Sequence, residues 1–134
     1  MSRRWYLHPF LYAQMEVVID DILSSSTQPP VILIQGDHGP GLHLSFSSFE
    51  RSCLRERLPI LSAYYLPAGS SARPYPAITP VNSFRVVFNA VFGGGLPLLP
   101  DASFYSTWDT LYDFVPAGDR VSQPCTQFIP PSDS

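Results

Sequence analysis

An aspartate and a histidine occupy positions 37 and 38, directly after a run of apolar residues. A carboxylate oxygen and an imidazole nitrogen both bind divalent cations, and the imidazole favours transition metals over Mg²⁺ and Ca²⁺. Gly36 and Gly39 flank the pair, and glycine lets an anionic substrate approach the main chain closely. The pattern predicts one divalent cation (Zn²⁺, Mn²⁺, Mg²⁺ or Ca²⁺) bound by Asp37 and His38. The same residues also fit a loop aspartate that binds its own turn beside an exposed histidine.

The segment before this pair decides where it lies in a fold. Residues 31–35 are Val-Ile-Leu-Ile-Gln, with four successive apolar positions and no alternation. This pattern is typical of a strand covered on both faces in a largely parallel sheet. In open α/β sheets, ligands bind beyond the carboxyl ends of the strands. The order of elements therefore predicts that Asp37 and His38 lie at a ligand-binding edge.

The remaining elements follow from periodicity and from helix-ending residues. A helix is expected over about 6–24, a second strand over 58–66, and a short extended piece near 112–115. Thr79-Pro80 starts another helix, and Gly93 ends it. One face of that helix is an apolar stripe, namely Val81, Phe84, Phe88, Val91 and Phe92, and its three aromatic residues are expected to pack in the core. The predicted fold is α/β, a partial and mostly parallel sheet flanked by helices.

The composition excludes several classes of protein. The chain has 134 residues, enough for one domain, and its net charge of −3 does not provide the basic surface that nucleic-acid binding requires. No apolar run reaches the ~20 residues that a membrane helix needs. Polar residues and proline interrupt the segment after Arg3 and Arg4, which argues against a signal peptide. We therefore expect no nucleic acid as a partner and no membrane segment in this chain.

Three blocks of the sequence, taken in order, are similar to a known family. They are residues 30–41 (PVILIQGDHGPG), 55–67 (RERLPILSAYYLP) and 75–85 (YPAITPVNSFR). Together they resemble the sulfatase-like branch of the alkaline phosphatase superfamily, which includes arylsulfatases and the membrane-anchored phosphoglycerol transferases of bacteria. The likeness extends over residues 6–116 and is much more specific than the Asp-His-Gly tripeptide alone.

The resemblance implies a role for two residues of this chain. In such proteins the aspartate and the histidine of this motif bind a divalent cation, which implies that Asp37 and His38 are metal ligands. The cation would stabilise charge on a sulfuryl or phosphoryl group and lower the pKa of the attacking group. The family's nucleophile, a serine, threonine or formylglycine, belongs to an earlier strand. No catalytic residue is therefore assigned to this chain.

The resemblance also implies a domain organisation and a function. Residues 1–118 resemble the C-terminal part of a sulfatase-like catalytic domain, and a poorly ordered tail is expected over 119–134. The implied function is part of a metal-dependent hydrolase or transferase acting on sulfate or phosphate esters. We expect the chain to be inactive alone because the nucleophile segment is missing. Similar proteins often display the catalytic domain outside the cytoplasmic membrane, which leaves the location of this chain open.

Two other interpretations remain. The chain is a non-catalytic truncated module, or a docking partner of a separately encoded N-terminal half. Alternatively, it is a small binding domain in which the Asp-His-Gly sequence is incidental. A fragment would expose apolar surface and tend to associate, whereas an independent domain would not.

Other polar residues near the motif have two interpretations each. His43 is either a third metal ligand or a solvated loop histidine. Three arginines either bind a sulfate or phosphate group or pair with Glu50 and Glu56 along a short helix. They are Arg51, Arg55 and Arg57. Cys53 and Cys125 are expected to be free thiols, and a disulfide that closes one long loop is the alternative.

Overall fold

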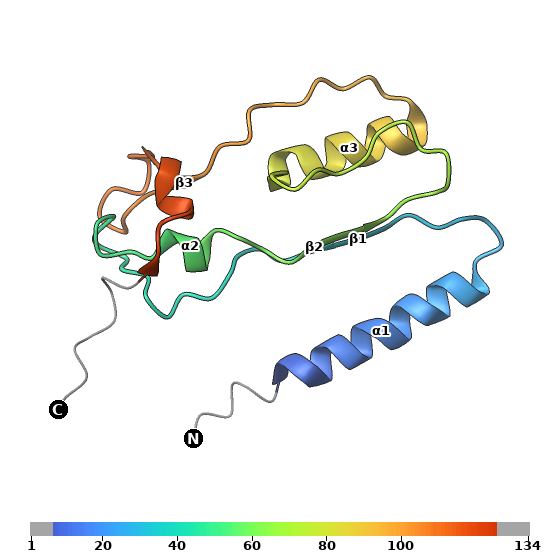
Figure 1. Ribbon diagram of the computed structural model, residues 1–134, viewed down its shortest axis with the longest axis horizontal. Coiled ribbons are helices and arrows are strands. Elements are labelled where there is room, and N and C mark those ends of the chain that lie inside the picture. The colour runs from blue at the N-terminus through green and yellow to red at the C-terminus, as the bar shows by residue number, and fades with distance from the viewer. Residues whose placement is uncertain (1–6, 126–134) are drawn as a thin grey trace.

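The computed structural model describes residues 7–125 and contains two longer helices and several short elements joined by irregular segments (Figure 1). In chain order the elements are α1 (Leu7–Ser25), β1 (Ile32–Gln35), α2 (Leu54–Arg57), β2 (Ser62–Tyr65), α3 (Pro80–Phe92), β3 (Phe104–Tyr105), β4 (Val115–Pro116) and the 3₁₀ helix η2 (Gly118–Val121). Of the tail expected over 119–134, residues 126–134 lie outside the described part. Residues 119–125 contain most of η2 and Cys125.

The predicted parallel sheet is wrong. β1 pairs with β2 in the antiparallel direction, with Ile32 opposite Tyr65 and Gln35 opposite Ser62. A second antiparallel pair joins β3 to β4, and residues 7–125 contain no parallel pair. The segment 36–61 leaves β1 and returns at the same end, so β2 begins where β1 stops. Parallel pairing would need a crossover that carries the chain back to the other end.

The apolar run of β1 has another explanation. Ile32, Leu33 and Ile34 are all half-buried, although they point alternately to the two faces of the pair. In the view of Figure 1, α1 lies on one side of β1 and β2, and α3 lies on the other. Partial burial of side chains on both faces produces a continuous apolar run whichever way the strands pair. The pattern therefore indicates burial and does not indicate strand direction.

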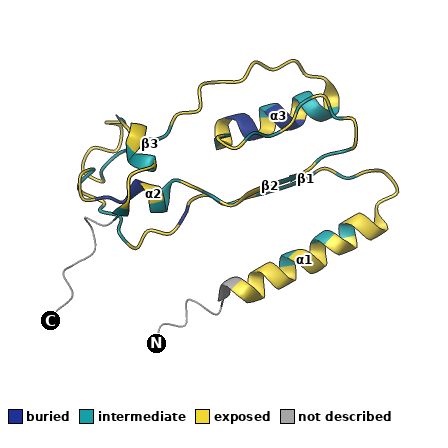
Figure 2. Cartoon of the chain, viewed as in Figure 1, coloured by how far each residue is buried: buried dark blue, intermediate teal, exposed yellow. Residues whose placement is uncertain are grey.

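The expected first helix is confirmed as α1. It ends where three serine hydroxyls donate back to the carbonyl oxygens of Asp21 and Ile22, at 2.6–3.2 Å. These serines are Ser24, Ser25 and Ser26. Hydroxyls that bind the preceding turn compete with the helical ladder, and Pro29-Pro30 then prevents the helix from continuing. Most of the described side chains of α1 are exposed (Figure 2).

The expected second helix is confirmed as α3, but its buried face differs from the expected one. Thr79 is the N-cap residue, Pro80 follows, and Gly93 ends the helix with a φ of 62°. The aromatic stripe predicted to lie in the core is exposed, with 73% of Phe92 accessible to solvent. The buried residues are Asn82, Ser83, Val86 and Val87. Hydrogen bonds select this face, since Ser83 and the Tyr64 hydroxyl of β2 lie 2.8 Å apart.

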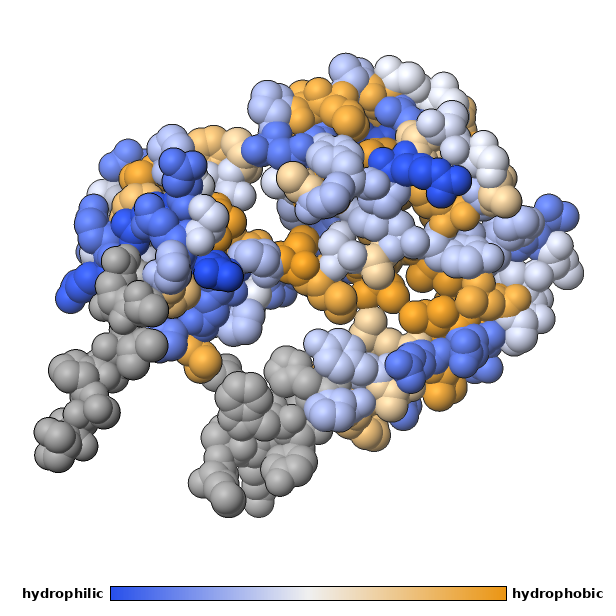
Figure 3. Space-filling view, in the orientation of Figure 1, coloured by the Kyte–Doolittle hydropathy of each residue, from blue (hydrophilic) through white to orange (hydrophobic). Residues whose placement is uncertain are grey.

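The core is small and lies around α2, β3 and β4. Leu54, Tyr105 and Ala117 are buried together, and half-buried apolar residues pack around them: Leu44, Phe49, Leu58 and Val121. Large apolar residues remain on the surface over α1, α3 and the segment 96–114, and apolar patches are visible in Figure 3. None of the helices within residues 7–125 has the length and apolar character needed to cross a membrane.

Candidate metal centre

Asp37 and His38 lie at the bend where the chain leaves β1. The N–H of Gly36 still donates to the carbonyl oxygen of Leu61 at 2.8 Å, which extends the β1–β2 ladder by one residue. The next two side chains turn toward each other, and Oδ2 of Asp37 lies 3.3 Å from Nε2 of His38. The Asp37 side chain is 87% exposed and that of His38 is 48% exposed. The structure thus brings the two predicted ligands together at a place that solvent reaches.

The separation of these two atoms fits a shared cation. Two ligands held by a tetrahedral Zn²⁺ at about 2.0–2.1 Å are roughly 3.3 Å apart. A carboxylate and an imidazole also match the donor preferences of Zn²⁺. A catalytic zinc site uses three protein ligands, and within residues 7–125 no further His, Cys, Asp or Glu forms a three-residue group with this pair. Asp37 and His38 therefore fit as part of a larger set of ligands.

The turn after His38 is packed tightly against α2. Gly39 is buried, and its N–H donates to the carbonyl oxygen of Arg57 at 2.8 Å. A Cβ at position 39 would collide with the carbonyl oxygen of Glu56 and would lie 2.6 Å from that of Pro59. Only glycine lets the two backbones approach this closely. Gly39 therefore holds the bend against the end of α2.

Arg57 is the charged side chain beside His38. Its Nη1 atom lies 2.7 Å from Nδ1 of His38 and donates to the carbonyl oxygen of Gly39 at 3.2 Å. Nδ1 of His38 itself lies 2.9 Å from that same carbonyl oxygen. Each ring nitrogen therefore has a polar neighbour: Asp37 at Nε2, and Arg57 with Gly39 at Nδ1.

The expected pairing of arginines with Glu50 and Glu56 is wrong for the part of the chain that the structure describes. Neither glutamate forms an ion pair with an arginine there. Glu50 accepts a hydrogen bond from the Ser48 hydroxyl at 3.0 Å. The helix α2 is only four residues long, so it lacks the successive turns that place charges three or four residues apart side by side.

Whether Arg57 lies beside His38 depends on strand direction. In an antiparallel pair, residues that precede β2 lie beside residues that follow β1. Arg57 precedes β2 and His38 follows β1, so the antiparallel register brings them together. The expectation of a parallel sheet concealed this relation.

Glu56 binds the loop that follows the bend, at Leu42 and His43. Its Oε1 accepts the N–H of Leu42 at 2.6 Å, and its Oε2 lies 2.8 Å from Nδ1 of His43. Partial burial raises the pKa of Glu56, but the hydrogen bonds from His43 and Leu42 outweigh it and hold the pKa below its ordinary value. His43 thus pairs with Glu56, and in the described part of the chain it forms no metal-binding group with Asp37 and His38.

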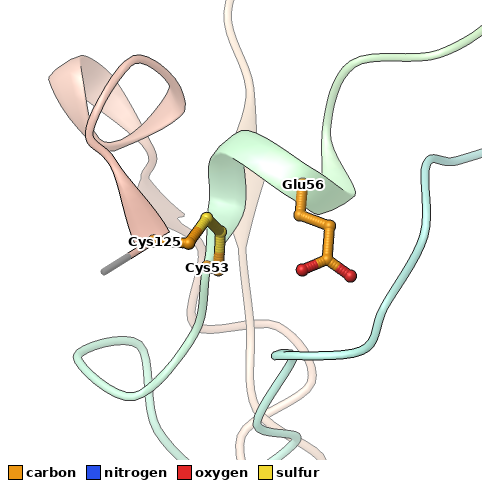
Figure 4. A group of neighbouring side chains, drawn as sticks. All are labelled: Cys53, Glu56 and Cys125. Atoms are coloured by element: carbon orange, nitrogen blue, oxygen red, sulfur yellow. A yellow bond between two sulfur atoms is a disulfide. The ribbon is translucent and has the colours of Figure 1, made fainter. Parts of the chain in front are cut away.

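Cys53 and Cys125 form a disulfide, so the expectation of two free thiols is wrong. Their Cα atoms are 5.5 Å apart, as in ordinary disulfides. Figure 4 shows Glu56 on α2, the short helix that begins directly after Cys53, and a carboxylate oxygen of Glu56 lies within 4.8 Å of both sulfur atoms. Sulfurs bonded to each other offer no thiolate to a metal. The bond instead ties the residue before α2 to the end of the described chain, and the Cys53 N–H donates to the carbonyl oxygen of His43 at 2.8 Å.

A second polar cluster lies at the start of α3. Oδ1 of Asp101 accepts hydrogen bonds from the hydroxyl and the N–H of Thr79 and from Nδ2 of Asn82, at 2.6–3.1 Å. Its Oδ2 accepts the Tyr75 hydroxyl. These hydrogen bonds, that of the Thr79 hydroxyl first, lower the pKa of Asp101 to about 2, and the contact with Asp101 raises the pKa of Tyr75. The cluster lines an open hollow of about 930 Å³, but both oxygens of Asp101 already bind donors of this chain. Its role is to hold α3 in place.

Comparison with known protein families, with curated proteins and with solved structures finds no match to this chain.

Proposed function

We propose that this chain supplies Asp37 and His38 as ligands to the divalent-cation centre of a sulfatase-like hydrolase or transferase acting on sulfate or phosphate esters. The separation of 3.3 Å between Asp37 Oδ2 and His38 Nε2 at an exposed bend carries this proposal. Further support comes from the rigid attachment of the bend to α2 through Gly39, since a ligand pair must be held in place before the cation arrives.

The chemistry of the site follows from its donors and its exposure. When bound, the cation supplies positive charge that stabilises a sulfuryl or phosphoryl group. The open side of Asp37 leaves room both for such a group and for further ligands. Within residues 7–125, no serine or threonine hydroxyl is hydrogen-bonded to Asp37 or His38. The proposal therefore assigns metal binding to this chain, and assigns the nucleophile and the remaining ligands to residues outside the pair.

Metal binding is tested by calorimetric titration of the purified chain with Zn²⁺, Mn²⁺, Mg²⁺ and Ca²⁺. We expect Zn²⁺ or Mn²⁺ to bind with one-to-one stoichiometry and with affinity limited by the presence of only two ligands. Asp37→Ala and His38→Ala should each abolish binding. Asp20→Ala, which removes an exposed carboxylate from α1, is the matched control and should leave it unchanged. Equal binding by all three variants would overturn the proposal.

Activity provides a separate test. We expect the purified chain to hydrolyse neither an aryl sulfate nor a phosphomonoester with any of the four cations, because the proposal places the nucleophile elsewhere. Turnover that requires the metal and disappears in Asp37→Ala would contradict this assignment.

Association with another polypeptide is a second candidate function. The specific observation is the exposure of large apolar side chains, above all Phe92, Trp108 and Tyr112. Exposed apolar area of this kind is typical of surfaces that another chain covers. Sedimentation of the purified chain tests this function: concentration-dependent association is expected, and a monomer at all concentrations would argue against it.

A further inference from the structure

Three side chains of types that bind metal ions lie together at the start of α2. Within residues 7–125 they are Cys53, Glu56 and Cys125, whose ligand atoms all lie within 4.8 Å of one another (Figure 4). Two sulfurs and a carboxylate form a donor set that suits Zn²⁺. The sulfurs are bonded to each other, so the set becomes available to a metal only when the disulfide is reduced.

The first turn of α2 positions two of these side chains. Cys53 is the N-cap residue, and the N–H of Glu56 donates to its carbonyl oxygen at 3.3 Å. The carboxylate of Glu56 is held by the Leu42 N–H, 2.6 Å from Oε1, and by Nδ1 of His43, 2.8 Å from Oε2. Each carboxylate oxygen has two lone pairs, so these contacts leave one on each oxygen for a cation. Carboxylates that bind metals are commonly oriented by hydrogen bonds of this kind.

The segment that carries Cys125 is attached to the region before α2 by contacts other than the disulfide. Nη2 of Arg120, in η2, donates to the carbonyl oxygens of Phe49, Glu50 and Ser52 at 3.1–3.2 Å. The guanidinium carbon also lies 4.8 Å from the centre of the Phe49 ring, a cation–π distance. Apolar side chains of α2 and η2 pack in the same small core. None of these contacts passes through the sulfurs, so they keep Cys125 beside Cys53 after reduction.

The change in geometry on reduction is small. A tetrahedral Zn²⁺ with Zn–S bonds of about 2.3 Å holds two sulfurs about 3.8 Å apart. The Cα atoms of Cys53 and Cys125 are 5.5 Å apart, so rotation of the two side chains reaches this separation while the backbone stays in place. Cys53 is buried and Cys125 is half-buried, so a reductant reaches the bond from the side of Cys125.

We infer that Cys53, Cys125 and Glu56 form a Zn²⁺ site when the disulfide is reduced, so that a metal bridge replaces the covalent bond. A dithiol reductant gives two electrons and two protons to the disulfide and is itself oxidised to a disulfide. Zn²⁺ then forms two Zn–S bonds and one Zn–O bond, and the two thiol protons pass to water. Three protein ligands leave the fourth tetrahedral position to water. The site shares no residue with Asp37 and His38, so it does not depend on the proposed function.

Cobalt spectroscopy of the full chain shows which atoms bind the metal. Co²⁺ replaces Zn²⁺ in such sites, and thiolate ligands give it an intense charge-transfer absorption that oxygen and nitrogen ligands do not give. The chain carries Asp37→Ala, which removes the other candidate site. A phosphine is the reductant, because a dithiol would itself bind the metal, and it takes an oxygen atom from water. The reduced chain should show the absorption with one Co²⁺ per chain, and the oxidised chain should not. Its absence from the reduced chain would overturn the inference.

Three variants in the same background identify the ligands. Cys125→Ser should lose one-to-one binding, because it removes one thiolate. Glu56→Gln should keep the charge-transfer absorption but bind Zn²⁺ about tenfold or more weakly, as measured by competition with a coloured chelator. Glu50→Gln is the matched control, since it removes a carboxylate that lies outside the group, and it should bind Zn²⁺ as the background does. If Glu56→Gln and Glu50→Gln bind Zn²⁺ equally, the carboxylate is not a ligand and the inferred site is wrong.

Urea unfolding shows whether the metal binds the folded chain. A ligand that binds only the folded state raises the unfolding midpoint. Zn²⁺ should therefore restore part of the midpoint that the reduced Asp37→Ala chain has lost, and Cys125→Ser in the same background should show no such rise. If the midpoint of the reduced chain does not rise, the thiols do not form a site in the fold and the inference fails. Zn²⁺ binding by the oxidised wild type, and its loss in oxidised Asp37→Ala, bear on the proposed function alone.

Discussion

The N–H of Gly39 donates a hydrogen bond of 2.8 Å to the carbonyl oxygen of Arg57. This contact joins the bend that carries Asp37 and His38 to the end of α2, across 18 residues of sequence. The two backbones are so close here that a Cβ on Gly39 would meet the carbonyl oxygens of Glu56 and Pro59. The stability of the fold and the proposed metal binding should therefore both depend on Gly39.

Gly39→Ala should destabilise the protein by about 1–3 kcal/mol, the usual cost of forcing extra atoms into a packed site. It should also weaken Zn²⁺ binding, because the bend must move away from α2 to admit the methyl group. Urea unfolding and calorimetry measure the two effects. Gly41→Ala is the control, since a Cβ there would make only ordinary contacts of 3.5 Å and longer. Equal stability of the two variants would show that the bend is not packed as described.

Reduction of the Cys53–Cys125 disulfide should lower the free energy of unfolding by about 4 kcal/mol, as expected for a bond that closes a loop of this length. Urea unfolding with and without dithiothreitol gives the difference. Cys125→Ser should match the reduced wild type and should not respond to the reductant. If dithiothreitol leaves the unfolding midpoint of the wild type unchanged, the bond does not form in solution.

Asp101 should make stability depend on pH in the acidic range. Its pKa is lowered from 3.8 to about 2 in the folded protein, so its contribution is fully present above the unfolded pKa and is lost as the pH falls toward 2. Asp101→Asn should therefore unfold at lower urea concentration than the wild type at pH 6, and the difference should shrink between pH 4 and pH 2. Asp20→Asn, on the exposed side of α1, is the matched control. A difference that does not vary with pH would contradict the assignment.

Glu56 should stabilise the loop through Leu42 and His43 while its carboxyl group is ionised. Its folded pKa lies below the ordinary value of 4.5, so this contribution is present above that pH and is lost at lower pH as the carboxylate takes up a proton. Glu56→Gln should lower stability by about 1 kcal/mol at neutral pH, the typical net contribution of one hydrogen bond.

Hydrogen exchange at the Leu42 amide gives the local measurement for Glu56, because this N–H donates directly to Oε1. Exchange should be faster in Glu56→Gln than in the wild type at neutral pH. Glu50→Gln, which removes an exposed carboxylate from the same loop region, should leave the Leu42 amide protected. If the Leu42 amide exchanged at the same rate in both variants, Glu56 would not be the residue that holds the loop.

Local chemistry made several elements predictable from the sequence. The apolar spacing of residues 11–23 and the serines and prolines that follow determined α1, because helix period and helix termination are properties of neighbouring residues. Thr79, Pro80 and Gly93 likewise marked both ends of α3. The Asp-His pair was recognisable because adjacent residues at the end of an apolar strand need no distant partner to lie together.

The rest depended on contacts between distant segments. The apolar run of β1 indicates cover on two faces, but only the path of the segment 36–61 sets the antiparallel pairing with β2. Which face of α3 is buried was decided by Asn82 and Ser83, whose hydrogen-bonding partners lie on other segments. The sequence did not predict the disulfide either, because two cysteines far apart in sequence bond only where the fold brings their Cα atoms together.

The sequence by itself determined that Asp37 and His38, two residues of types that bind metal ions, come directly after an apolar strand. Only the tertiary structure placed Arg57 against His38 and Gly39 against α2. The physical reason is that strand direction decides which residues meet beyond the ends of a strand, and direction is not encoded in the local pattern of apolar side chains.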